Sequence, residues 1–180
     1  MTKFIVYACP TGELAEQLKT YFDKSRMAYG PNMAHQYMPH CTLTGFFEDV
    51  PGAVPRYTQK LERSLKRLRR SQPEPVIDVK DLVFRADWHG LELSSEWLRK
   101  LILDFVCTAT SATRKTPLRP KDWLHLSLAY DFVSEQSDDL KALAVNLVDP
   151  QAPVDWELRF YQHNPDKSWI CHQQLKLSKP

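Results

Sequence analysis

Residues 123–130 read Trp-Leu-His-Leu-Ser-Leu-Ala-Tyr, and polar and apolar side chains alternate along most of this stretch. Such alternation is typical of a β-strand that has one face in the core. His125 and Ser127 would then share one face of the strand, while Leu126 and Leu128 would anchor the other. The strand therefore presents an imidazole and a hydroxyl on the same side.

A second stretch repeats this pattern nearer the start of the chain. Residues 37–47 read Tyr-Met-Pro-His-Cys-Thr-Leu-Thr-Gly-Phe-Phe and predict extended structure, in which His40 and Thr42 share one face. The two His-x-(Thr/Ser)-Leu tetrapeptides begin 85 positions apart (125 minus 40). A single match of this kind is common in proteins, whereas two matches on predicted strands are considerably more specific.

Segments on both sides of the two tetrapeptides follow one order: strand, helix, histidine-containing strand, helix, strand. The first half, about 1–86, contains predicted strands at 4–9 and 76–84 and predicted helices at 14–27 and 54–71. The second half, about 87–180, contains a turn at 87–90, strands at 91–93 and 123–130, helices at 97–110 and 137–147, and a terminal hairpin from 156 through 177. We interpret this order as a diverged internal duplication.

Length and composition favour one compact domain. The 180 residues are 43% hydrophobic and 26% charged, which is typical of a globular chain, and the formal charge of +2 does not by itself argue for a nucleic-acid or membrane partner. No apolar run approaches membrane-spanning length or resembles a signal peptide, which predicts a cytoplasmic protein. The four cysteines include no Cys-x-x-Cys pair and are interpreted as buried thiols. We expect a monomer and no protein partner.

The two polar pairs suit the chemistry of phosphoryl transfer. If the halves pack about a pseudo-two-fold axis, two imidazoles and two hydroxyls surround one small anion. Displacement at phosphorus needs a base for the attacking group and an acid for the leaving oxygen, and histidine suits both tasks near neutral pH. His40 and His125 are therefore the predicted catalytic pair, without an assignment of acid and base. Thr42 and Ser127 are the predicted phosphate ligands.

The paired motifs, one in each half, resemble those of the 2H (two-histidine) phosphoesterase superfamily, which includes LigT-like, 2′,3′-cyclic phosphodiesterase-like enzymes. The resemblance covers essentially the whole chain, although Pro39 before the first histidine has no counterpart before the second. It implies an α+β fold: a single bilobal domain with two pseudo-symmetric lobes of mainly antiparallel sheet and flanking helices around a central groove. It also implies catalysis without a metal or any other cofactor.

The resemblance further implies a phosphodiesterase that hydrolyses a 2′,3′-cyclic phosphate on a nucleotide or an RNA 3′-end, as in RNA processing. Other phosphodiesters stay open, including 2′-5′ linkages, cyclic dinucleotides and ADP-ribose cyclic phosphate. One rival interpretation is a nucleotide- or RNA-binding module without turnover, and another is a non-enzymatic scaffold. Both histidines and both hydroxyls are present, which favours an enzyme, since binding alone would not need a matched acid and base.

Side chains close to the motifs are candidates for substrate contact. Tyr37, Trp123 and Tyr130 are aromatic and could stack on a base, and Trp123 shares its predicted strand face with the second motif's histidine. Arg119 and Lys121 belong to the loop that leads into the second motif strand, a common place for substrate contacts. We expect these five residues to border the site.

Two further groups of residues receive a simpler interpretation. The predicted helix 54–71 carries seven Arg and Lys residues and one Glu, which is typical of a solvated helix face, with an RNA-backbone footprint as the alternative. The other four histidines have no partner at metal-ligand spacing and are interpreted as ordinary surface or turn residues. The sequence therefore predicts no metal site. These histidines are His35, His89, His163 and His172.

Overall fold

The computed structural model describes residues 1–178, and these form one eight-stranded sheet in which all paired strands are antiparallel. The strand order is β4-β5-β6-β2-β1-β7-β8, and β3 pairs with β1. The strands are β1 (Thr2–Thr11), β2 (Cys41–Thr42), β3 (Phe47–Asp49), β4 (Asp78–Phe84), β5 (Trp88–Ser94), β6 (His125–Tyr130), β7 (Asp155–His163) and β8 (Trp169–Lys176).

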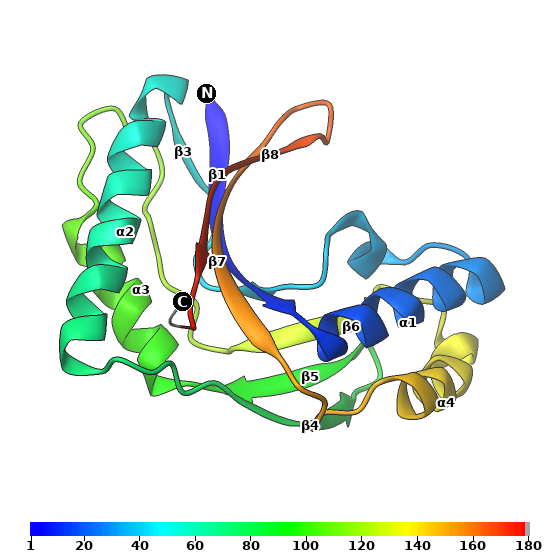
Figure 1. Cartoon of the computed structure of the whole chain (residues 1–180). Helices are drawn as coiled ribbons and strands as arrows, with labels where there is room; N and C mark the ends of the chain where they lie inside the picture. Colours follow the sequence, from blue (N-terminus) through cyan, green and yellow to red (C-terminus); the bar gives the residue numbers. More distant parts are fainter. Residues whose placement is uncertain (179–180) are drawn as a thin grey trace.

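Four α-helices accompany the sheet in two pairs (Figure 1). Helix α2 packs against α3, and α1 packs against α4, with the curved sheet between the two pairs. The helices are α1 (Glu13–Tyr29), α2 (Val54–Ser71), α3 (Glu96–Thr108) and α4 (Ser137–Leu147), and three short 3-10 segments are η1 (Met33–Gln36), η2 (Pro51–Ala53) and η3 (Ser134–Gln136). This arrangement confirms the predicted α+β class.

The predicted helices agree closely with the observed ones. Helices α2 and α4 have the predicted bounds, 54–71 and 137–147. Helix α2 buries Tyr57, Leu61 and Leu65 at steps of four residues, which is the apolar stripe that identified it. At the start of α3, the Ser95 hydroxyl oxygen accepts a hydrogen bond from the backbone N–H of Leu98 at 3.0 Å, as expected of an N-cap.

Two strand predictions are wrong in extent. Of the stretch 37–47, only Cys41–Thr42 and the first residue of β3 are in strands, because hydrogen bonds to other segments bend the chain between them. Of the predicted turn at 87–90, only Asp87 lies in a bend; Trp88, His89 and Gly90 begin β5, in which Trp88 pairs with Tyr130 and His89 pairs with Ala129 of β6. In both cases, pairing with a segment far away in the sequence determines where the strand begins and ends.

A narrow junction, here called the seam, joins two parts of the sheet. Strands β2 and β6 pair there through Cys41 and Leu126. Residues 43–45 continue the seam alongside residues 119–121: the N–H of Gly45 donates to the Arg119 carbonyl at 3.0 Å, and the N–H of Lys121 donates to the Leu43 carbonyl at 2.9 Å. On one side of the seam lie β4, β5 and β6, and on the other lie β2, β1, β7 and β8.

The two parts of the sheet do not correspond to the two halves of the chain. Strand β1 begins the chain and pairs along its length with β7, from Lys3 opposite His163 to Thr11 opposite Asp155. Strand β4 belongs to the first half of the sequence but pairs with β5 of the second half. The halves therefore interleave, which gives the described residues one continuous sheet.

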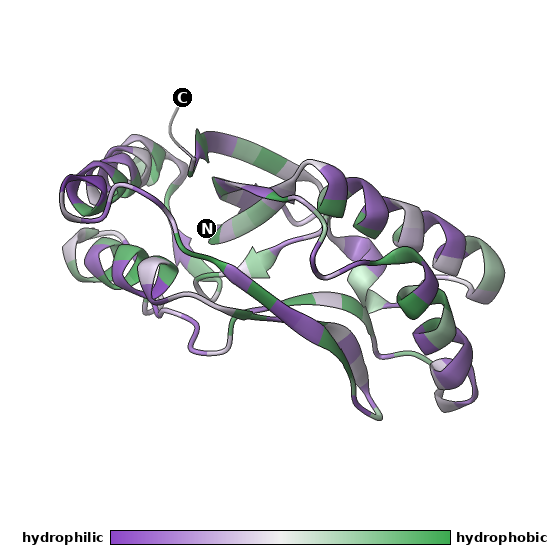
Figure 2. Ribbon diagram, turned by 60° about the horizontal axis from the view of Figure 1, so that its bottom comes forward, coloured by the Kyte–Doolittle hydropathy of each residue, from purple (hydrophilic) through white to green (hydrophobic). Residues whose placement is uncertain are grey.

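The core lies between the sheet and its helices. Alternate residues of β1 divide between two apolar clusters: Phe4, Val6 and Ala8 belong to the large one, while Ile5 and Tyr7 belong to a small one. The large cluster includes buried residues from all four helices. Figure 2 shows the helices with both hydrophilic and hydrophobic residues around their circumference, as expected of helices that cover a core on one side.

The helices and the cysteines test two expectations drawn from composition. No helix within residues 1–178 is long and apolar enough to cross a membrane. Cys9 and Cys41 are buried thiols as predicted, whereas Cys107 and Cys171 are exposed, so that part of the prediction is wrong. Both exposed thiols lie on regular elements, α3 and β8, whose outer faces are solvated.

Candidate functional site

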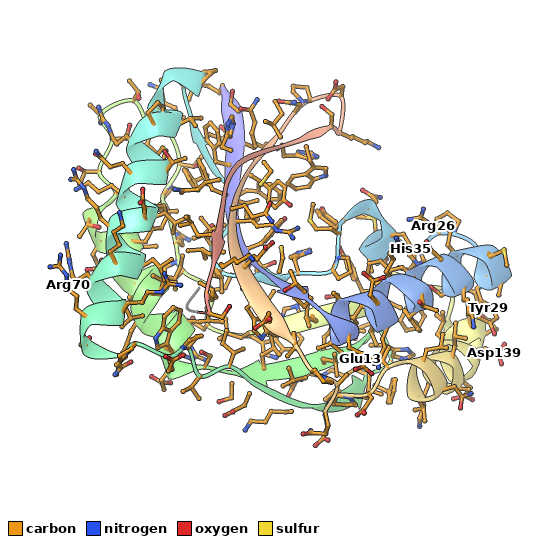
Figure 3. The ribbon with its side chains drawn as sticks, in the orientation of Figure 1. Glu13, Arg26, Tyr29, His35, Arg70 and Asp139 are labelled. Atoms are coloured by element: carbon orange, nitrogen blue, oxygen red, sulfur yellow. The ribbon has the colours of Figure 1, made fainter. Side chains whose placement is uncertain are left out.

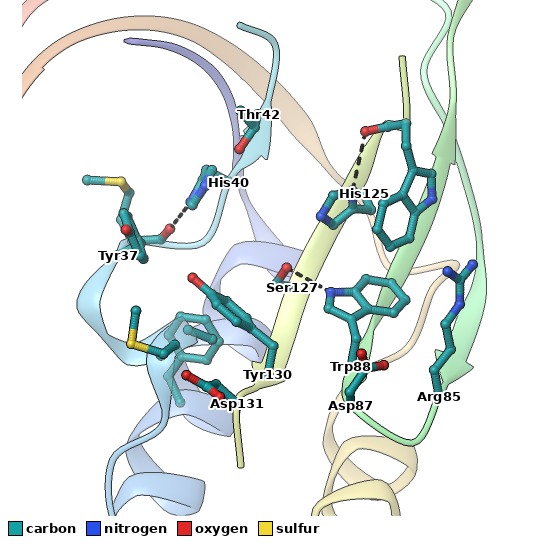
Figure 4. Close-up of a pocket in the computed structure, with 15 residues that line it drawn as sticks. Tyr37, His40, Thr42, Arg85, Asp87, Trp88, His125, Ser127, Tyr130 and Asp131 are labelled. Carbon is teal, nitrogen blue, oxygen red and sulfur yellow. Dashed lines mark hydrogen bonds between the residues drawn. The ribbon is translucent and has the colours of Figure 1, made fainter. Parts of the chain in front are cut away.

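The two predicted histidines and both predicted hydroxyl residues line one pocket of about 560 Å³ (Figure 4). His40 and Thr42 come from the segment that enters and forms β2, while His125 and Ser127 come from β6. A second, adjoining cavity of about 350 Å³ shares His40, Thr42 and His125 with the first. The histidine pair therefore stands between two adjoining cavities.

The register of the seam explains why these four side chains meet. Cys41 pairs with Leu126, and both side chains are buried in the large core cluster. One residue further in each direction, the same antiparallel register brings Thr42 opposite His125, and His40 opposite Ser127. Because side chains alternate between the faces, all four polar groups lie on the side away from the core. The faces predicted from alternation are therefore those observed.

Each imidazole is oriented by a main-chain carbonyl two residues before it. The Nδ1 atom of His40 lies 2.7 Å from the Met38 carbonyl oxygen, and Nδ1 of His125 lies 3.3 Å from the Trp123 carbonyl oxygen. A carbonyl can only accept, so Nδ1 carries the proton in both rings. Each Nε2 is then left to exchange a proton with a ligand in the pocket, as a base when neutral and as an acid when charged.

The surroundings of the two rings differ. The His40 ring packs on Tyr7, with ring centroids 3.9 Å apart, and burial lowers its pKa to about 4 despite the hydrogen bond to Met38. The His125 ring stacks on Trp123 at 3.8 Å and is perpendicular to the Trp88 indole, with centroids 5.3 Å apart. Burial also lowers the His125 pKa, although its hydrogen bond to Trp123 acts in the opposite direction. Both imidazoles are thus neutral at pH 7 when the pocket holds no anion.

Two cations lie near His125, of which the sequence identified one. Lys121 lines the smaller cavity, as expected of a substrate-contact residue. Arg85 was not predicted, but its guanidinium lies 4.7 Å from the Trp123 ring centroid and pairs with Glu92 at 2.9 Å. The predicted contact residue Arg119 lines neither cavity, because its main chain is part of the seam and its side chain is exposed.

The three aromatic candidates all border the site. Tyr37, Trp123 and Tyr130 each line both cavities. Trp123 is 42% exposed, and its indole stacks on the His125 ring while the Arg85 guanidinium also lies over it. Burial raises the pKa of Tyr130 to about 12, and its phenol therefore stays protonated and can donate a hydrogen bond.

One residue that touches two members of the site was not predicted from the sequence. The Trp88 side chain is 8% exposed, lines the larger cavity, and donates a hydrogen bond from Nε1 to the Ser127 hydroxyl oxygen at 2.9 Å. Because residues 87–90 were predicted to form a turn, Trp88 was not expected to lie on a strand beside Ser127. Gly90 pairs opposite Ser127, and this glycine within a strand was the signal that another group approaches closely there.

Two of the other histidines are buried, so their interpretation as surface or turn residues is wrong. His89 of β5 hydrogen-bonds through Nε2 to Ser137 of α4 at 3.2 Å. His35 hydrogen-bonds through Nε2 to Ser25 at 3.0 Å and attaches η1 to helix α1, at the side of the molecule labelled in Figure 3. In the described part of the chain, no three His, Cys, Asp or Glu side chains converge as metal ligands.

The basic helix α2 lies away from the pocket. None of its residues lines either cavity. Arg67 pairs with Asp104 of α3 at 2.6 Å, and Arg69 donates to the Lys176 carbonyl oxygen at 2.6 Å. Arg70 points outward at the far end of the helix in Figure 3. Several of its cations therefore serve contacts between elements of the fold.

Comparisons with known proteins place the chain beside longer ones. No family model matches the chain, so its resemblance to the 2H superfamily stays a prediction. The chain is 31% identical over 180 residues to the ecdysteroid-phosphate phosphatase of Bombyx mori, covering 98% of this chain and 26% of that protein. It is 30% identical to the Drosophila melanogaster protein of the same name, covering 91% of this chain and 26% of that protein. It is also 31% identical over 183 residues to ubiquitin-associated and SH3 domain-containing protein B of Homo sapiens, covering 99% of this chain and 27% of that protein.

These names overturn the predicted reaction. The two insect relatives are named as phosphatases of an ecdysteroid phosphate, which contradicts the prediction of a 2′,3′-cyclic phosphodiesterase acting on nucleotides or RNA ends. The motif residues could not reveal this error, because two imidazoles and two hydroxyls suit many phosphate esters. The chain spans about a quarter of the length of the curated relatives it matches, and along nearly its whole length it is similar to part of a protein named as a phosphatase.

Proposed function

We propose that this chain is a phosphatase that hydrolyses a phosphate ester in the two-histidine pocket. One observation carries the proposal: His40 and His125 line one cavity, and each donates its Nδ1 proton to a main-chain carbonyl. Across the seam, His40 lies opposite Ser127 and His125 lies opposite Thr42. The insect relatives' name supports a phosphate ester of a hydroxylated organic compound as substrate.

The pocket residues suit each step of such a hydrolysis. A phosphate dianion bound between the rings would raise their pKa values and favour one protonated imidazole. The neutral imidazole takes a proton from water as the water oxygen bonds to phosphorus, and the protonated imidazole gives its proton to the ester oxygen as the phosphorus–oxygen bond breaks. Alcohol and inorganic phosphate result. Thr42 and Ser127 can donate to the non-bridging oxygens.

Activity on phosphomonoesters tests the proposal. Purified chain would be incubated with an ecdysteroid phosphate, an aryl phosphate and a 5′-nucleotide, and inorganic phosphate would be measured from pH 5 to 9. We expect His40→Ala and His125→Ala each to lower kcat/KM by about 100-fold or more, since general acid and base groups contribute that much. His172→Ala is the matched control, because His172 lines neither cavity and bonds instead to Gln162.

Three results would contradict this proposal. One is phosphate release that is unchanged in both pocket variants. Another is hydrolysis of a 2′,3′-cyclic nucleotide by a protein that turns over none of the monoesters. The third is binding of phosphate without any hydrolysis, which would make the pocket a recognition site.

A further inference from the structure

We propose that Trp88 is a positioning residue that holds the Ser127 hydroxyl ready to donate a hydrogen bond to a phosphate oxygen. The proposal rests on the proposed function, which supplies the phosphate group in the pocket. Trp88 belongs to β5, and Ser127 belongs to the neighbouring strand β6. Nothing in the motif predicted from the sequence assigns Trp88 a role.

The direction of the hydrogen bond determines where the Ser127 proton points. The indole N–H of Trp88 can only donate, so the Ser127 hydroxyl oxygen, 2.9 Å away, must accept. The hydroxyl has one proton and two acceptor sites, and Trp88 occupies one acceptor site. In residues 1–178, Trp88 is the hydrogen-bond partner of this hydroxyl. Its proton is therefore free for a ligand in the cavity, which both side chains line (Figure 4).

The fold makes room for the indole at this place. Gly90 pairs opposite Ser127, and a Cβ on this glycine would collide with the Leu126 carbonyl oxygen and with the six-membered ring of Trp88. The pairing register of β5 and β6 also shifts between His89 and Gly90. A glycine beside a bulge is a common way to admit a bulky group against a strand. The Trp88 ring therefore lies over Gly90 and reaches the serine.

Neighbouring side chains hold the indole in this orientation. Its ring centroid is 4.8 Å from that of Trp123, and the Arg85 guanidinium lies 5.5 Å from its centroid. Arg85 is in turn held by Glu92 at 2.9 Å. The same indole and the His125 ring are perpendicular to each other, with centroids 5.3 Å apart. Trp88 is thus fixed from several sides, as a positioning group must be if it is to orient another side chain.

The Thr42 hydroxyl has a different environment. In the described part of the chain, no indole or other side chain donates to it, although it lines the same cavity. The two hydroxyls of the motif pair are therefore not equivalent. Ser127 is oriented before a ligand arrives, and an oriented donor binds an anion without losing rotational freedom at that moment.

Two measurements test this role, and the first needs no activity. Trp88→Phe removes one of the five indole N–H resonances in a nitrogen–proton NMR spectrum and thereby assigns it. We expect Ser127→Ala to shift that same resonance and to speed its exchange with water. An unchanged resonance in Ser127→Ala would show that the hydrogen bond is absent in solution and would overturn the proposal.

The second measurement is a double-mutant cycle on the Kd for inorganic phosphate. We expect Trp88→Phe to weaken binding by about 5-fold and Ser127→Ala by about 10-fold, with less than about 2-fold further loss when Trp88→Phe is added to Ser127→Ala. Trp97→Phe is the matched control, because its indole N–H donates to the Gln72 carbonyl at 3.0 Å outside the pocket. This control should leave the Kd unchanged.

The outcomes separate this proposal from the proposed function. Phosphate binding with fully additive losses would overturn the positioning role and leave the phosphatase intact. Absence of both phosphate binding and hydrolysis in the unmodified chain would overturn the proposed function, and the positioning role with it. Another outcome is a shift of the acid side of the pH–rate profile in Trp88→Phe without a change in the Kd for phosphate. That result would overturn the role in orienting Ser127 and show that Trp88 acts on the ionisation of His125.

Discussion

Two histidines five positions apart carry their protons on opposite ring nitrogens. His40 donates from Nδ1 to a carbonyl, whereas Nδ1 of His35 accepts from the Asn32 backbone N–H at 3.0 Å, so the His35 proton is on Nε2. That proton is donated to the Ser25 hydroxyl oxygen. The His35 ring is therefore committed to the fold on both sides, while His40 keeps Nε2 for the pocket. Residue type alone does not distinguish these two cases.

The lowered pKa of His40 predicts a loss of stability in mild acid. The folded state has a His40 pKa of about 4, below the usual 6.5, so it binds fewer protons than the unfolded chain between these values. The stabilisation is complete above pH 6.5 and is lost as the pH falls toward 4. Between pH 6.5 and 4 the free energy of unfolding of both proteins should fall. We expect the fall to be about 2 to 3 kcal/mol smaller in His40→Asn than in the unmodified chain, because the variant lacks this imidazole.

Urea denaturation at several pH values measures this difference. Each variant is compared with its own stability at pH 7.5, so that any general effect of the substitution cancels. Parallel curves for the two proteins would show that the His40 imidazole titrates normally and would contradict the prediction.

At the scale of elements, η1 is attached to α1 by a short hydrogen-bonded chain. His35 bonds to Ser25, and the Ser25 hydroxyl donates to the Phe22 carbonyl at 3.2 Å. Arg26 adds a bond to the His35 carbonyl oxygen at 2.9 Å. The segment after η1 carries Met38, whose carbonyl orients His40. The position of this imidazole therefore depends on a contact five residues earlier in the chain.

Removing the His35 ring should affect both stability and activity. His35→Ala leaves buried polar groups without partners, and we expect a loss of about 2 to 4 kcal/mol in the free energy of unfolding and a lower kcat. Ser25→Ala removes both hydrogen bonds of the Ser25 hydroxyl but keeps the His35 ring and its bond to Asn32, so it should cost less, about 1 to 2 kcal/mol, with kcat nearly unchanged. Urea unfolding and phosphatase assays on both variants check this, and a His35→Ala chain with unchanged stability and unchanged kcat would argue against the attachment.

The sequence predicts elements well where local signals decide them. Helices α2 and α4 follow from apolar spacing within their own residues, and the faces of His40 and His125 follow from alternation. The extent of the first motif strand could not be predicted, because residues 43–45 pair with residues 119–121 far along the chain. The hydrogen bond of Trp88 to Ser127 could not be predicted either, since the two residues are 39 positions apart. Such contacts depend on the sheet order, which single segments do not encode.

At the scale of the whole molecule, Asp49 at the end of β3 links this strand to helix α2 and to the loop after α3. Its carboxylate accepts hydrogen bonds from Tyr57 of α2 at 2.7 Å and from Thr113 in the loop after α3 at 2.5 Å. Burial alone would raise the Asp49 pKa, but hydrogen bonds from Ser111, Thr113 and Tyr57 prevail and lower it to about 2. The charged form is therefore part of the folded structure.

A second acid-dependent loss of stability should follow at lower pH. Because the folded pKa of Asp49 is depressed, its contribution is present above about pH 4 and disappears as the pH falls toward 2. We expect Asp49→Asn to lower the free energy of unfolding by about 2 kcal/mol at pH 7 and to reduce the further loss between pH 4 and 2. Thermal unfolding across this range measures it, and a loss of stability between pH 4 and 2 as large as in the unmodified chain would refute the assignment.

The seam also governs how this molecule can change over generations. The two imidazoles are brought together across the seam by main-chain hydrogen bonds between residues 41–45 and 119–126. Insertions in the β7–β8 hairpin or beyond the ends of α4 would leave these hydrogen bonds in place. A lineage can therefore replace the walls around the pocket, and with them the compounds it accepts, while the pair of nitrogens at its centre keeps the same separation.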